Sequence, residues 1–560
     1  MMRTTQYFIT FFVQFFLINS SDIVPLDVGV HLFVDEQYIE NMTSLEFQNG
    51  HIEKDLDHPL VYPEYPWEAA VHFYNSFLQV PSNLSTTGAP MYMIYYACVD
   101  SSAIIYNDNV SVCVANSSDG IHWEKPLFWY YPYTANGTKP AQATNIVFTT
   151  NVNEFLGTVF IDTRPGTTRS EIFKMSYENE FVRYVYVATS EDGFRWKAGI
   201  KPAHPLAGLS DTQTAMFYSS ENGGQYVLYG RADWFVRNSS VYCPGANPAF
   251  RRVMVTTSSG DIYGPWTIPM EAFALGVPDP VQCFDNYNPA ALYYYGVYFI
   301  FPSGYWHWPV NDSGAPIPLA AANDGVMDIR LAISRTALGP YRFPTRDPFI
   351  SRGIGTIDPK TKLVNGTGSD RDAGFVFASS NGLMDPDFIR SDVGTPSAWM
   401  YHIYWGSQTT HAGGGTVLGR YWPGAYSGIF RARLRREGYV ALSTLVSEPT
   451  GFGEFISQIL SLPVKKNGQQ LLLHINAEIA TAGGLAVQFE DGLTRNPIPG
   501  FTFDECKTLH GNGIRQLLEW KTRNGTYSGD LNPLIDYPNG LRVHLQMTHT
   551  KLYSWLLSYV

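Results

Sequence analysis

The sequence has few charged residues and few cysteines for its length. Of its 560 residues, 16% are Asp, Glu, Lys or Arg, and 5 are Cys. So few cysteines exclude a disulfide-rich scaffold, and the lack of CxxC, HExxH or close His/Cys clusters argues against a zinc site. Basic residues are outnumbered 38 to 50, and the net charge of −12 argues against nucleic acid or an anionic membrane as a partner.

The sequence also lacks long amphipathic helical stretches, whereas aromatic and turn-forming residues are abundant. It contains 36 Tyr, 34 Phe, 49 Gly and 36 Pro, a composition that favours a β-rich chain with many turns. Apolar residues alternate with polar ones in short runs, for example Arg251 to Ser258, Asp328 to Arg335 and Leu541 to Met547. This alternation is typical of half-buried strands, so we expect an all-β fold.

No apolar run after the first twenty residues is long enough to cross a bilayer. Residues 1–20 carry Arg3, an apolar run and then small polar residues, which is the layout of a signal peptide. Nine Asn-X-Ser/Thr sequons follow, at Asn41, Asn83, Asn109, Asn116, Asn136, Asn238, Asn311, Asn365 and Asn524. We therefore expect a secreted or secretory-pathway glycoprotein without a membrane anchor.

The five cysteines allow two disulfides. Cys98 and Cys113 lie on consecutive strand-like runs, and Cys243 and Cys283 flank a region the size of a hairpin. Each pair can be joined in an oxidising compartment. Cys506 is then left over, and we expect it to be buried rather than reactive.

A strand, a tight turn and an aromatic residue recur along the chain. Two copies, "VSVCVANSSDGIHW" and "RYVYVATSEDGFRW", end in Trp123 and Trp196; looser copies end in Trp266 and Phe343, and a degenerate fifth runs from Ile429 to Leu442. We interpret Asp119 and Asp192 as turn residues, and Trp123 and Trp196 as packing between sheets. The drifting spacing is typical of one sheet per repeat with variable loops.

Each repeat contains about four strands, because a further aromatic hairpin precedes each copy, as in Met91 to Ala97 and Gln225 to Arg231. Five such units predict a five-bladed β-propeller over residues 67–447, preceded by a lead-in segment, 21–66. Residues 448–560 read as a compact β-sandwich. The alternative, a series of β-sandwich domains, requires longer units with less similar endings.

Polar residues just before the first strand of each unit are the candidates for chemistry, because the innermost strands of a propeller meet at a central channel. The chain supplies one carboxylate per unit: Glu68, Asp162, Asp211, Asp285 and Asp372. The accompanying residues that we expect to bind substrate are Arg164, Glu171, Arg231, Trp306, His307, Arg330 and Trp405. Converging carboxylates beside aromatic rings are what glycoside cleavage requires.

Each of these residues has a simpler interpretation. An Asp near a strand often caps a turn through backbone N–H groups, and Arg231 and Arg330 can serve only to pair with carboxylates. Trp306 can pack within a sheet, and His307 can belong to a surface loop. Recurrence at equivalent positions is what favours a common site.

Several segments together resemble a broad group of proteins related to glycoside hydrolase families 32 and 43. They are "HLFVDEQYIENM", "HPLVYPEYPWE", "TSEDGFRW", "LSDTQTAMFY", "DNYNPAALYYYGVYFIFPS", "DIRLAISR", "DAGFVFASS", "IYWGSQTTH" and "PIPGFTFDEC". They extend over nearly all of the expected mature chain. The resemblance implies a five-bladed propeller followed by a β-sandwich, in agreement with the repeats.

The resemblance also implies three channel carboxylates, which correspond in position to Glu68, Asp211 and either Asp285 or Asp372. The sequence departs from the families elsewhere: "RDP" occurs at Arg346 to Pro348 at the end of a unit, and "EC" at Glu505 and Cys506 lies in the C-terminal region. Family 43 has an acid Glu at the start of a strand in the fourth unit, and this sequence has no clear Glu at the corresponding place. Either an Asp supplies the acid, or the reaction has changed, or the protein binds without cleaving.

Two functions follow as hypotheses. The first is a secreted glycosidase, with Glu68 and Asp211 as nucleophile or base and transition-state stabiliser and with Asp285 or Asp372 as acid. The second is an extracellular carbohydrate-binding or interaction propeller without turnover. No cofactor is expected, and an acidic channel with a structural cation such as Ca²⁺ is compatible with either function.

Overall fold

The computed structural model covers most of the chain in describable detail. It describes residues 23–68, 70–99, 110–134, 140–149, 154–179, 184–204, 213–234, 251–272, 285–307, 325–345, 347–355, 370–390, 394–408, 427–447 and 449–560. The expected signal peptide, Asp211, Cys243 and Cys283 lie outside these ranges.

The chain forms two compact units. One comprises residues Phe47–Ala441, and the other combines Met1–Glu46 with Leu442–Val560. The points of division fall within two strands, β4 (Leu45–Asn49) and β28 (Val440–Thr444). Of the strands that precede the repeats, only those before Glu46 therefore belong to the unit that contains the C-terminus.

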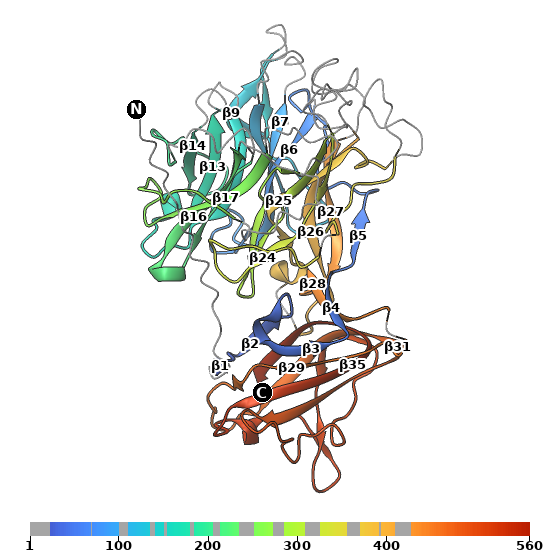
Figure 1. Ribbon diagram of the computed structural model, residues 1–560. Helices are drawn as coiled ribbons and strands as arrows, with labels where there is room; N and C mark the ends of the chain where they lie inside the picture. Colours follow the sequence, from blue (N-terminus) through green and yellow to red (C-terminus); the bar gives the residue numbers. More distant parts are fainter. Residues whose placement is uncertain are drawn as a thin grey trace, which may run out of the picture. The chain divides into compact units, whose positions relative to one another are not determined.

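The strands of the unit of residues 47–441 pair mainly in five antiparallel groups, which are called the first to fifth sheets by their place along the chain (Figure 1). The first and fifth sheets are joined by one parallel pair, Ser76 with Ser380. The first sheet comprises β6 (Ala70–Val80), β7 (Met91–Val99), β8 (Val110–Ser117) and β11 (Ile146–Phe148). The second comprises β12 (Glu154–Ile161), β13 (Phe173–Asn179) and β14 (Val185–Ser190). The third comprises β15 (Ala215–Ser219), β16 (Gln225–Trp234), β17 (Arg251–Ser259) and β18 (Met270–Glu271).

The last two sheets are completed by strands from distant parts of the chain. The fourth comprises β20 (Ala291–Tyr294), β21 (Val297–Ile300) and β24 (Ala332–Ser334). The fifth comprises β25 (Phe375–Met384), β26 (Trp399–Ser407), β27 (Ser427–Arg435) and β5 (Ile52–Asp55). Because β5 precedes the first sheet in sequence, it ties the start of this unit to its last sheet.

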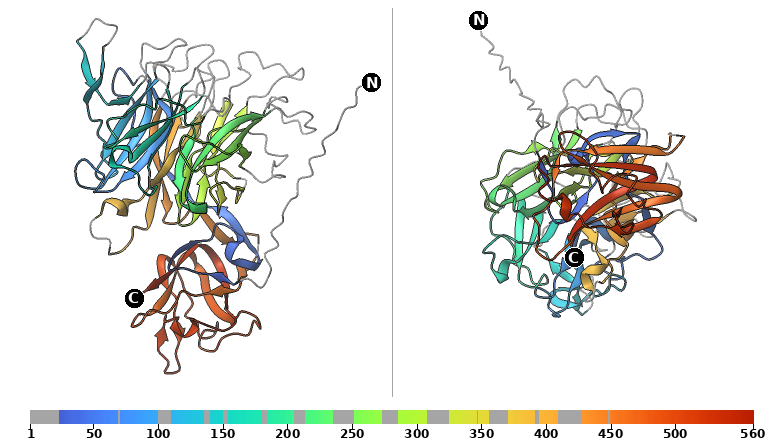
Figure 2. Two further views of the ribbon diagram at one scale, coloured as in Figure 1. Left: turned by 90° about the vertical axis from the view of Figure 1, so that its left-hand side faces the viewer. Right: turned by 90° about the horizontal axis from the view of Figure 1, so that it is seen from below.

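Further strands lie beside these sheets. β9 (Phe128–Tyr133) and β10 (Gln142–Thr144) form a hairpin that extends beyond the neighbouring strands (Figure 1 and Figure 2). β19 (Asp285–Asn286), β22 (Ser303–His307) and β23 (Gly325–Ile329) follow one another in an antiparallel ladder, and β23 pairs in parallel with β25. This ladder carries several of the residues singled out in the sequence.

The hydrophobic core of this unit lies between successive sheets. One apolar cluster lies between the first and second sheets and includes Met93 and Met175. A second lies between the second and third sheets and includes Val187 and Met216. A third lies between the third and fourth sheets and includes Tyr229 and Ile300. A further cluster joins the fifth sheet to the first and includes Phe377, Ile403 and Phe77. Each sheet is therefore apolar on both faces, which agrees with strands that read as near-continuous apolar runs.

The repeated strand endings form the same turn. In the copy that ends at Trp196, Asp192 Oδ1 accepts hydrogen bonds from the backbone N–H groups of Phe194 and Arg195, both at 2.8 Å. Asp119 accepts from Ile121 and His122 in the same way. Trp196 of the second sheet lies edge-on to Tyr95 of the first. The predicted turn role of the two Asp residues and the predicted packing role of Trp196 are confirmed.

Buried polar side chains link the first strands of the five sheets. Gln213, just before β15, donates to Asn75 O on β6 at 2.6 Å, to Gly157 O on β12 at 3.1 Å and to Ser380 Oγ on β25 at 3.2 Å. Asn288, just before β20, donates to Gln213 Oε1 at 3.2 Å. All five first strands, or the residues next to them, thus meet in one hydrogen-bonded group around the fully buried Gln213.

The other unit is built on two long antiparallel strands, β31 (Leu471–Asp491) and β35 (Leu541–Tyr559). β2 (Gly29–Leu32) pairs with β35, and β3 (Ile39–Thr43) pairs with β29 (Phe452–Ser457). The remaining strands are β1 (Val24–Pro25), β30 (Leu460–Ser461), β32 (Asn512–Leu517), β33 (Trp520–Lys521) and β34 (Tyr527–Ser528). Alternating buried residues along β31 and β35 supply the core of this unit.

The expected all-β fold is confirmed. In the part of the chain that the structure describes, helix is limited to 3-10 turns at Glu36–Tyr38, Arg169–Glu171, Glu221–Gly223, Pro386–Ile389 and Asn532–Leu534. None of these is long and apolar enough to cross a membrane.

One of the two expected disulfides falls within the described residues. Cys98 on β7 and Cys113 on β8 form a disulfide, as predicted. Cys506 is a buried free thiol, also as predicted. The pairing of Cys243 with Cys283 lies outside the described residues and stays a prediction.

Candidate functional site

A pocket of about 540 Å³ opens beside the β22–β23 ladder, and its volume is typical of small-molecule sites, about 300 to 1,000 Å³. One wall comes from strands β22 and β23 and the other from the segment 351–355. The lining residues are Trp306, Val326, Met327, Asp328, Ser351, Arg352, Gly353, Ile354 and Gly355. Of the residues selected from the sequence, Trp306 lines this pocket directly.

Asp328 is held by three donors at the wall of the pocket. Arg330 donates from Nε to Oδ1 at 2.5 Å and from Nη2 to Oδ2 at 2.8 Å, and the indole N–H of Trp306 donates to Oδ2 at 3.0 Å. Asp328 and Arg330 are two residues apart in an extended segment, so their side chains leave the same face. Burial raises the pKa of Asp328, while the guanidinium of Arg330 opposes that rise.

Trp306 is positioned by its place on β22. It lies opposite Val326 in the register with β23, and its indole N–H bond to Asp328 fixes the orientation of the ring. The guanidinium of Arg330 lies 5.6 Å from the ring centroid, within the range of a cation–π contact. The partly buried indole is therefore a fixed apolar surface in the pocket.

Asp372 lies directly behind the pocket wall, just before β25. Its side chain is fully buried, and it accepts from Lys54 Nζ at 2.8 Å and from the Tyr404 hydroxyl at 3.1 Å, both on Oδ2. Its other oxygen, Oδ1, has no hydrogen-bond partner among the described residues. Burial raises the pKa of Asp372, and the ammonium of Lys54 opposes that rise.

Gly353 brings the pocket and Asp372 together. Its backbone N–H donates to Asp372 O at 3.1 Å, and a Cβ at this position would lie 2.3 Å from Asp372 Oδ1. Such a distance is too short for any side chain, so only glycine lets the segment 351–355 run this close to the carboxyl group. The orphaned oxygen of Asp372 therefore abuts a residue of the pocket wall.

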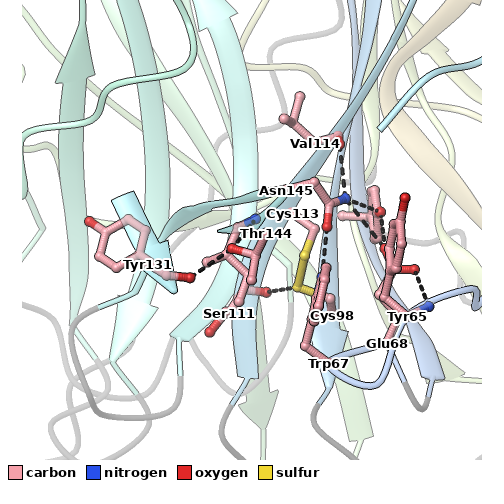
Figure 3. The surroundings of a disulfide bond; sticks show 12 residues. Tyr65, Trp67, Glu68, Cys98, Ser111, Cys113, Val114, Tyr131, Thr144 and Asn145 are labelled. Carbon is pink, nitrogen blue, oxygen red and sulfur yellow. Dashed lines mark hydrogen bonds between the residues drawn. A yellow bond between two sulfur atoms is a disulfide. The ribbon is translucent and has the colours of Figure 1, made fainter. Parts of the chain in front are cut away.

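Glu68, by contrast, is saturated with donors (Figure 3). Oε2 accepts from Lys125 Nζ at 2.8 Å and from the backbone N–H groups of Glu64 at 3.1 Å and Tyr65 at 3.3 Å. Oε1 accepts from the Tyr96 hydroxyl and from Asn145 Nδ2. Both oxygens of this buried carboxylate are thus engaged, which leaves little capacity for a further partner.

The Cys98–Cys113 disulfide lies beside the hydrogen-bond network of Glu68 (Figure 3). Tyr96 and Cys98 are on β7, Cys113 is on β8, and Asn145 binds the backbone of Val114 on β8 at 3.0 Å. The side chain of Asn145 also accepts from the indole N–H of Trp67 at 2.7 Å. The covalent link therefore holds together the two strands that position the partners of Glu68.

A carboxylate with one lysine and one tyrosine occurs at three places. Asp162 accepts from Tyr226 at 2.7 Å and pairs with Lys174 at 3.0 Å, as Glu68 does with Tyr96 and Lys125 and Asp372 with Tyr404 and Lys54. The expectation that Asp162 precedes the first strand of its unit is wrong, because it follows β12. The prediction took β13 as the first strand of this unit, which is one strand too late. Asp162 is thus at the opposite end of its strand from Glu68 and Asp372.

The other residues predicted to bind substrate are dispersed. The guanidinium of Arg164 lies 5.6 Å from the ring of Tyr226, that of Arg231 lies 5.1 Å from the ring of Tyr287, and Glu171 is exposed on a 3-10 turn. Trp405 is 3% exposed, and its indole N–H donates to Val71 O at 2.8 Å. Its ring is packed in the core beside Phe375, so it offers no accessible surface in this structure.

Two selected residues are described only through their backbone. Asp285 pairs with Tyr305 between β19 and β22, and His307 pairs with Gly325 between β22 and β23. Both therefore belong to the ladder that forms one wall of the pocket.

Sequence reasoning did not select Asp328, Arg352 or Lys54. Asp328 had a detectable signal, because it stands two residues before the selected Arg330 in an alternating run. Arg352 and Lys54 had none, since they reach the site from segments without a repeat motif. In the described part of the chain, no group of three or more His, Cys, Asp or Glu residues has the geometry to hold a metal ion.

No family model matches the chain, and no curated protein matches it. Solved structures are similar at low identity. One represents the GH130 family of mannoside phosphorylases, with glycoside hydrolases that target β-1,2-mannosidic linkages in Candida mannan; its identity is 16% and its TM-score 0.39, over 69% of this chain and 94% of that one. A fructofuranosidase from Schwanniomyces occidentalis has 10% identity and a TM-score of 0.37, over 91% and 99%. A thermostable family-43 glycoside hydrolase has 14% identity and a TM-score of 0.35, over 70% and 98%.

Proposed function

We propose that the protein is a glycan-active enzyme of the glycoside hydrolase type, built on a five-bladed β-propeller and a β-sandwich. Five antiparallel sheets with cores between them support the propeller, as do β5 in the fifth sheet and the polar group around Gln213. Two long paired strands with alternating burial support the sandwich.

The observation that carries this function is the pocket itself. It combines an oriented indole, Trp306, with the carboxyl group of Asp328 in its wall and that of Asp372 behind Gly353. Glycoside cleavage needs one carboxyl group that gives a proton to the leaving oxygen and a second carboxylate that attacks or activates water. Aromatic rings bind the apolar faces of sugars beside such groups.

The environments of the carboxyl groups suggest different roles. Asp372 is the proposed acid, because burial raises its pKa and one of its oxygens is unoccupied. Asp328, held by Arg330, is the proposed stabiliser of positive charge in the transition state. Glu68 and Asp211 remain the proposed sources of the nucleophile or base, and Glu68 has to exchange a donor to act in this way. Asp285 remains the alternative acid.

A second candidate function is glycan binding without turnover. It is favoured by one observation, the complete occupation of both Glu68 oxygens by donors. A carboxylate bound in this manner is a structural anchor rather than a nucleophile.

The experiment that separates these functions is a screen of hydrolysis and binding with a panel of β-fructosides, arabinosides, xylosides and other glycans. For an enzyme, Asp372→Asn should lower turnover by about 100-fold or more and leave binding in place, since a carboxamide cannot donate the proton. Asp347→Asn, an exposed change in the same unit, is the matched control. Binding without hydrolysis by the unchanged protein would establish the second function.

We also propose that the protein is exported and glycosylated. The Cys98–Cys113 disulfide supports an oxidising compartment, and the sequon residues Asn41, Asn83 and Asn524 are exposed. Secretion from a eukaryotic host, with a loss of mass on treatment with an N-glycosidase, is the expected result.

A further inference from the structure

Arg352 is a cation of the pocket without an ion-pair partner among the described residues. Arg352 lines the pocket, and its Nη1 donates to the backbone oxygen of Ala373 at 2.8 Å. The side chain is partly exposed. A guanidinium in this state has donors available for a ligand.

The nearby acids are already committed to other donors. Asp328 is bound by Arg330 and Trp306, Asp372 is paired with Lys54, and Asp370 accepts from the backbone N–H of Ile354 at 2.7 Å. Of these three, only Asp328 lines the pocket. Arg330 forms two hydrogen bonds with Asp328, and Arg352 acts on the same carboxyl group only through its charge, which lowers the pKa of Asp328. No ion pair among the described residues therefore occupies the guanidinium of Arg352, which can pair with an anionic ligand.

The pocket thus presents an apolar indole and an available planar cation to the same volume. Trp306 is on the β22 wall and Arg352 on the facing segment 351–355, where Gly353 and Gly355 carry no side chains that would fill the space. A sugar ring can pack against the indole of Trp306. A carboxylate can bind the guanidinium of Arg352, since a guanidinium binds carboxylates in a two-point geometry. The net charge of the chain is −12, so the positive charge in this pocket is local and does not belong to a general positive surface. Such a local charge favours an anionic ligand at this place.

We infer that this pocket binds an acidic sugar, with the carboxylate of the sugar on Arg352 and its ring against Trp306. This inference rests on the proposed function, because it names the class of glycan that the same site takes. It predicts that a uronic-acid unit occupies the pocket and that the neutral counterpart binds weakly.

The test compares matched glycans by calorimetry. The probes are oligogalacturonate and oligoglucuronate, their methyl esters and their carboxyl-reduced forms, with sodium acetate as a competitor that contains no sugar. We expect one acidic glycan to bind roughly 10-fold to 100-fold more tightly than its ester, the gain of a charged hydrogen bond. Acetate at the same concentration should not displace it.

Two variants assign the preference to Arg352. Arg352→Gln should remove the difference in affinity between the acidic glycan and its ester, whereas Arg352→Lys, which keeps the charge but loses the planar two-point geometry, should retain part of this difference. Arg523→Gln, an exposed change in the other unit, is the control. Thermal melting of each variant verifies that it is folded.

The outcomes separate the inference from the proposed function. Equal affinity for the acidic and neutral forms, or an acid preference that survives in Arg352→Gln, overturns the inference; the proposed function then still stands if Asp372→Asn abolishes turnover of a neutral glycan. If no glycan binds the unchanged protein, the proposed function fails and the inference fails with it.

Discussion

Single residues of one chemical type occupy very different states in this protein. Glu68 and Asp372 are both buried carboxylates that precede the first strand of a sheet, and each has a lysine and a tyrosine partner. Backbone N–H groups and an amide complete the hydrogen bonds of Glu68, whereas one buried oxygen of Asp372, beside Gly353, has no hydrogen-bond partner among the described residues. The number of donors therefore distinguishes an anchor from a candidate acid.

The pairing of Asp372 with Lys54 predicts a pH effect. Lys54 lowers the pKa that burial raises, so Lys54→Met should raise the pKa of Asp372 further. An acid with a higher pKa stays protonated to higher pH, and the alkaline limb of the kcat/KM profile should therefore move to higher pH. Measured pH–rate profiles of both proteins check this expectation.

Two controls accompany this profile. Lys54→Arg keeps the charge and should retain the original limb, and Lys521→Met, an exposed change, should have no effect. A limb that stays in place or moves to lower pH in Lys54→Met would contradict the assignment of Asp372 as the acid.

At the residue scale, the sequence could indicate Asp372 but not its partners. Asp372 precedes an alternating run, which is visible locally, whereas Lys54 is 318 positions away. The position of Trp306 in a pocket could also be anticipated from its aromatic surroundings. Arg352 could not, because its role depends on a glycine that lets its segment approach β25.

Among the structural elements, the Ser-X-Asp-Gly turns are the most regular. Ser190 and Ser117 donate from their hydroxyl groups to Asp192 and Asp119, both at 3.1 Å, and each Asp caps the backbone that follows. Such short-range hydrogen bonds depend on neighbouring residues alone, and for this reason the turns were predictable from the sequence. The placement of Asp162 was not, because the sequence did not reveal β12 as the strand that begins its sheet.

The turns predict a local contribution to stability. Asp192→Ala removes the acceptor of two backbone N–H groups and should lower the free energy of unfolding by about 1 to 2 kcal/mol. Urea denaturation measures this loss. The adjacent exposed Glu191→Ala should change stability by less than about 0.5 kcal/mol, and equal losses in the two variants would refute the capping role.

In the whole molecule, the organisation depends on contacts that the sequence does not display. The five repeats and the all-β character are local patterns, and the five sheets agree with them. The convergence on Gln213 is a long-range feature: it joins residues as far apart as Asn75 and Ser380, and a single Gln between turn residues carries no signal of it. The pairing of β2 with β35 is hidden in the same way, since the two strands lie near opposite ends of the chain.

The position of Gln213 predicts a global effect on stability. Gln213→Leu keeps the approximate volume but removes the donor to Asn75 O and Gly157 O, so the free energy of unfolding should fall by about 3 kcal/mol or more. Chemical denaturation monitored by tryptophan fluorescence tests this expectation. Gln469→Leu, at an exposed position, is the control, and a similar small loss in both variants would show that the central network is dispensable.

The central claim is that the pocket beside the β22–β23 ladder receives a sugar next to Asp372. A crystal structure of the protein with its tightest-binding glycan tests it most directly. We predict a sugar ring between Trp306 and Arg352, with the segment 351–355 shifted from its present position so that the glycosidic oxygen reaches the buried Asp372 carboxyl group. Glycan bound elsewhere on the protein, with this pocket filled by solvent alone, would contradict it.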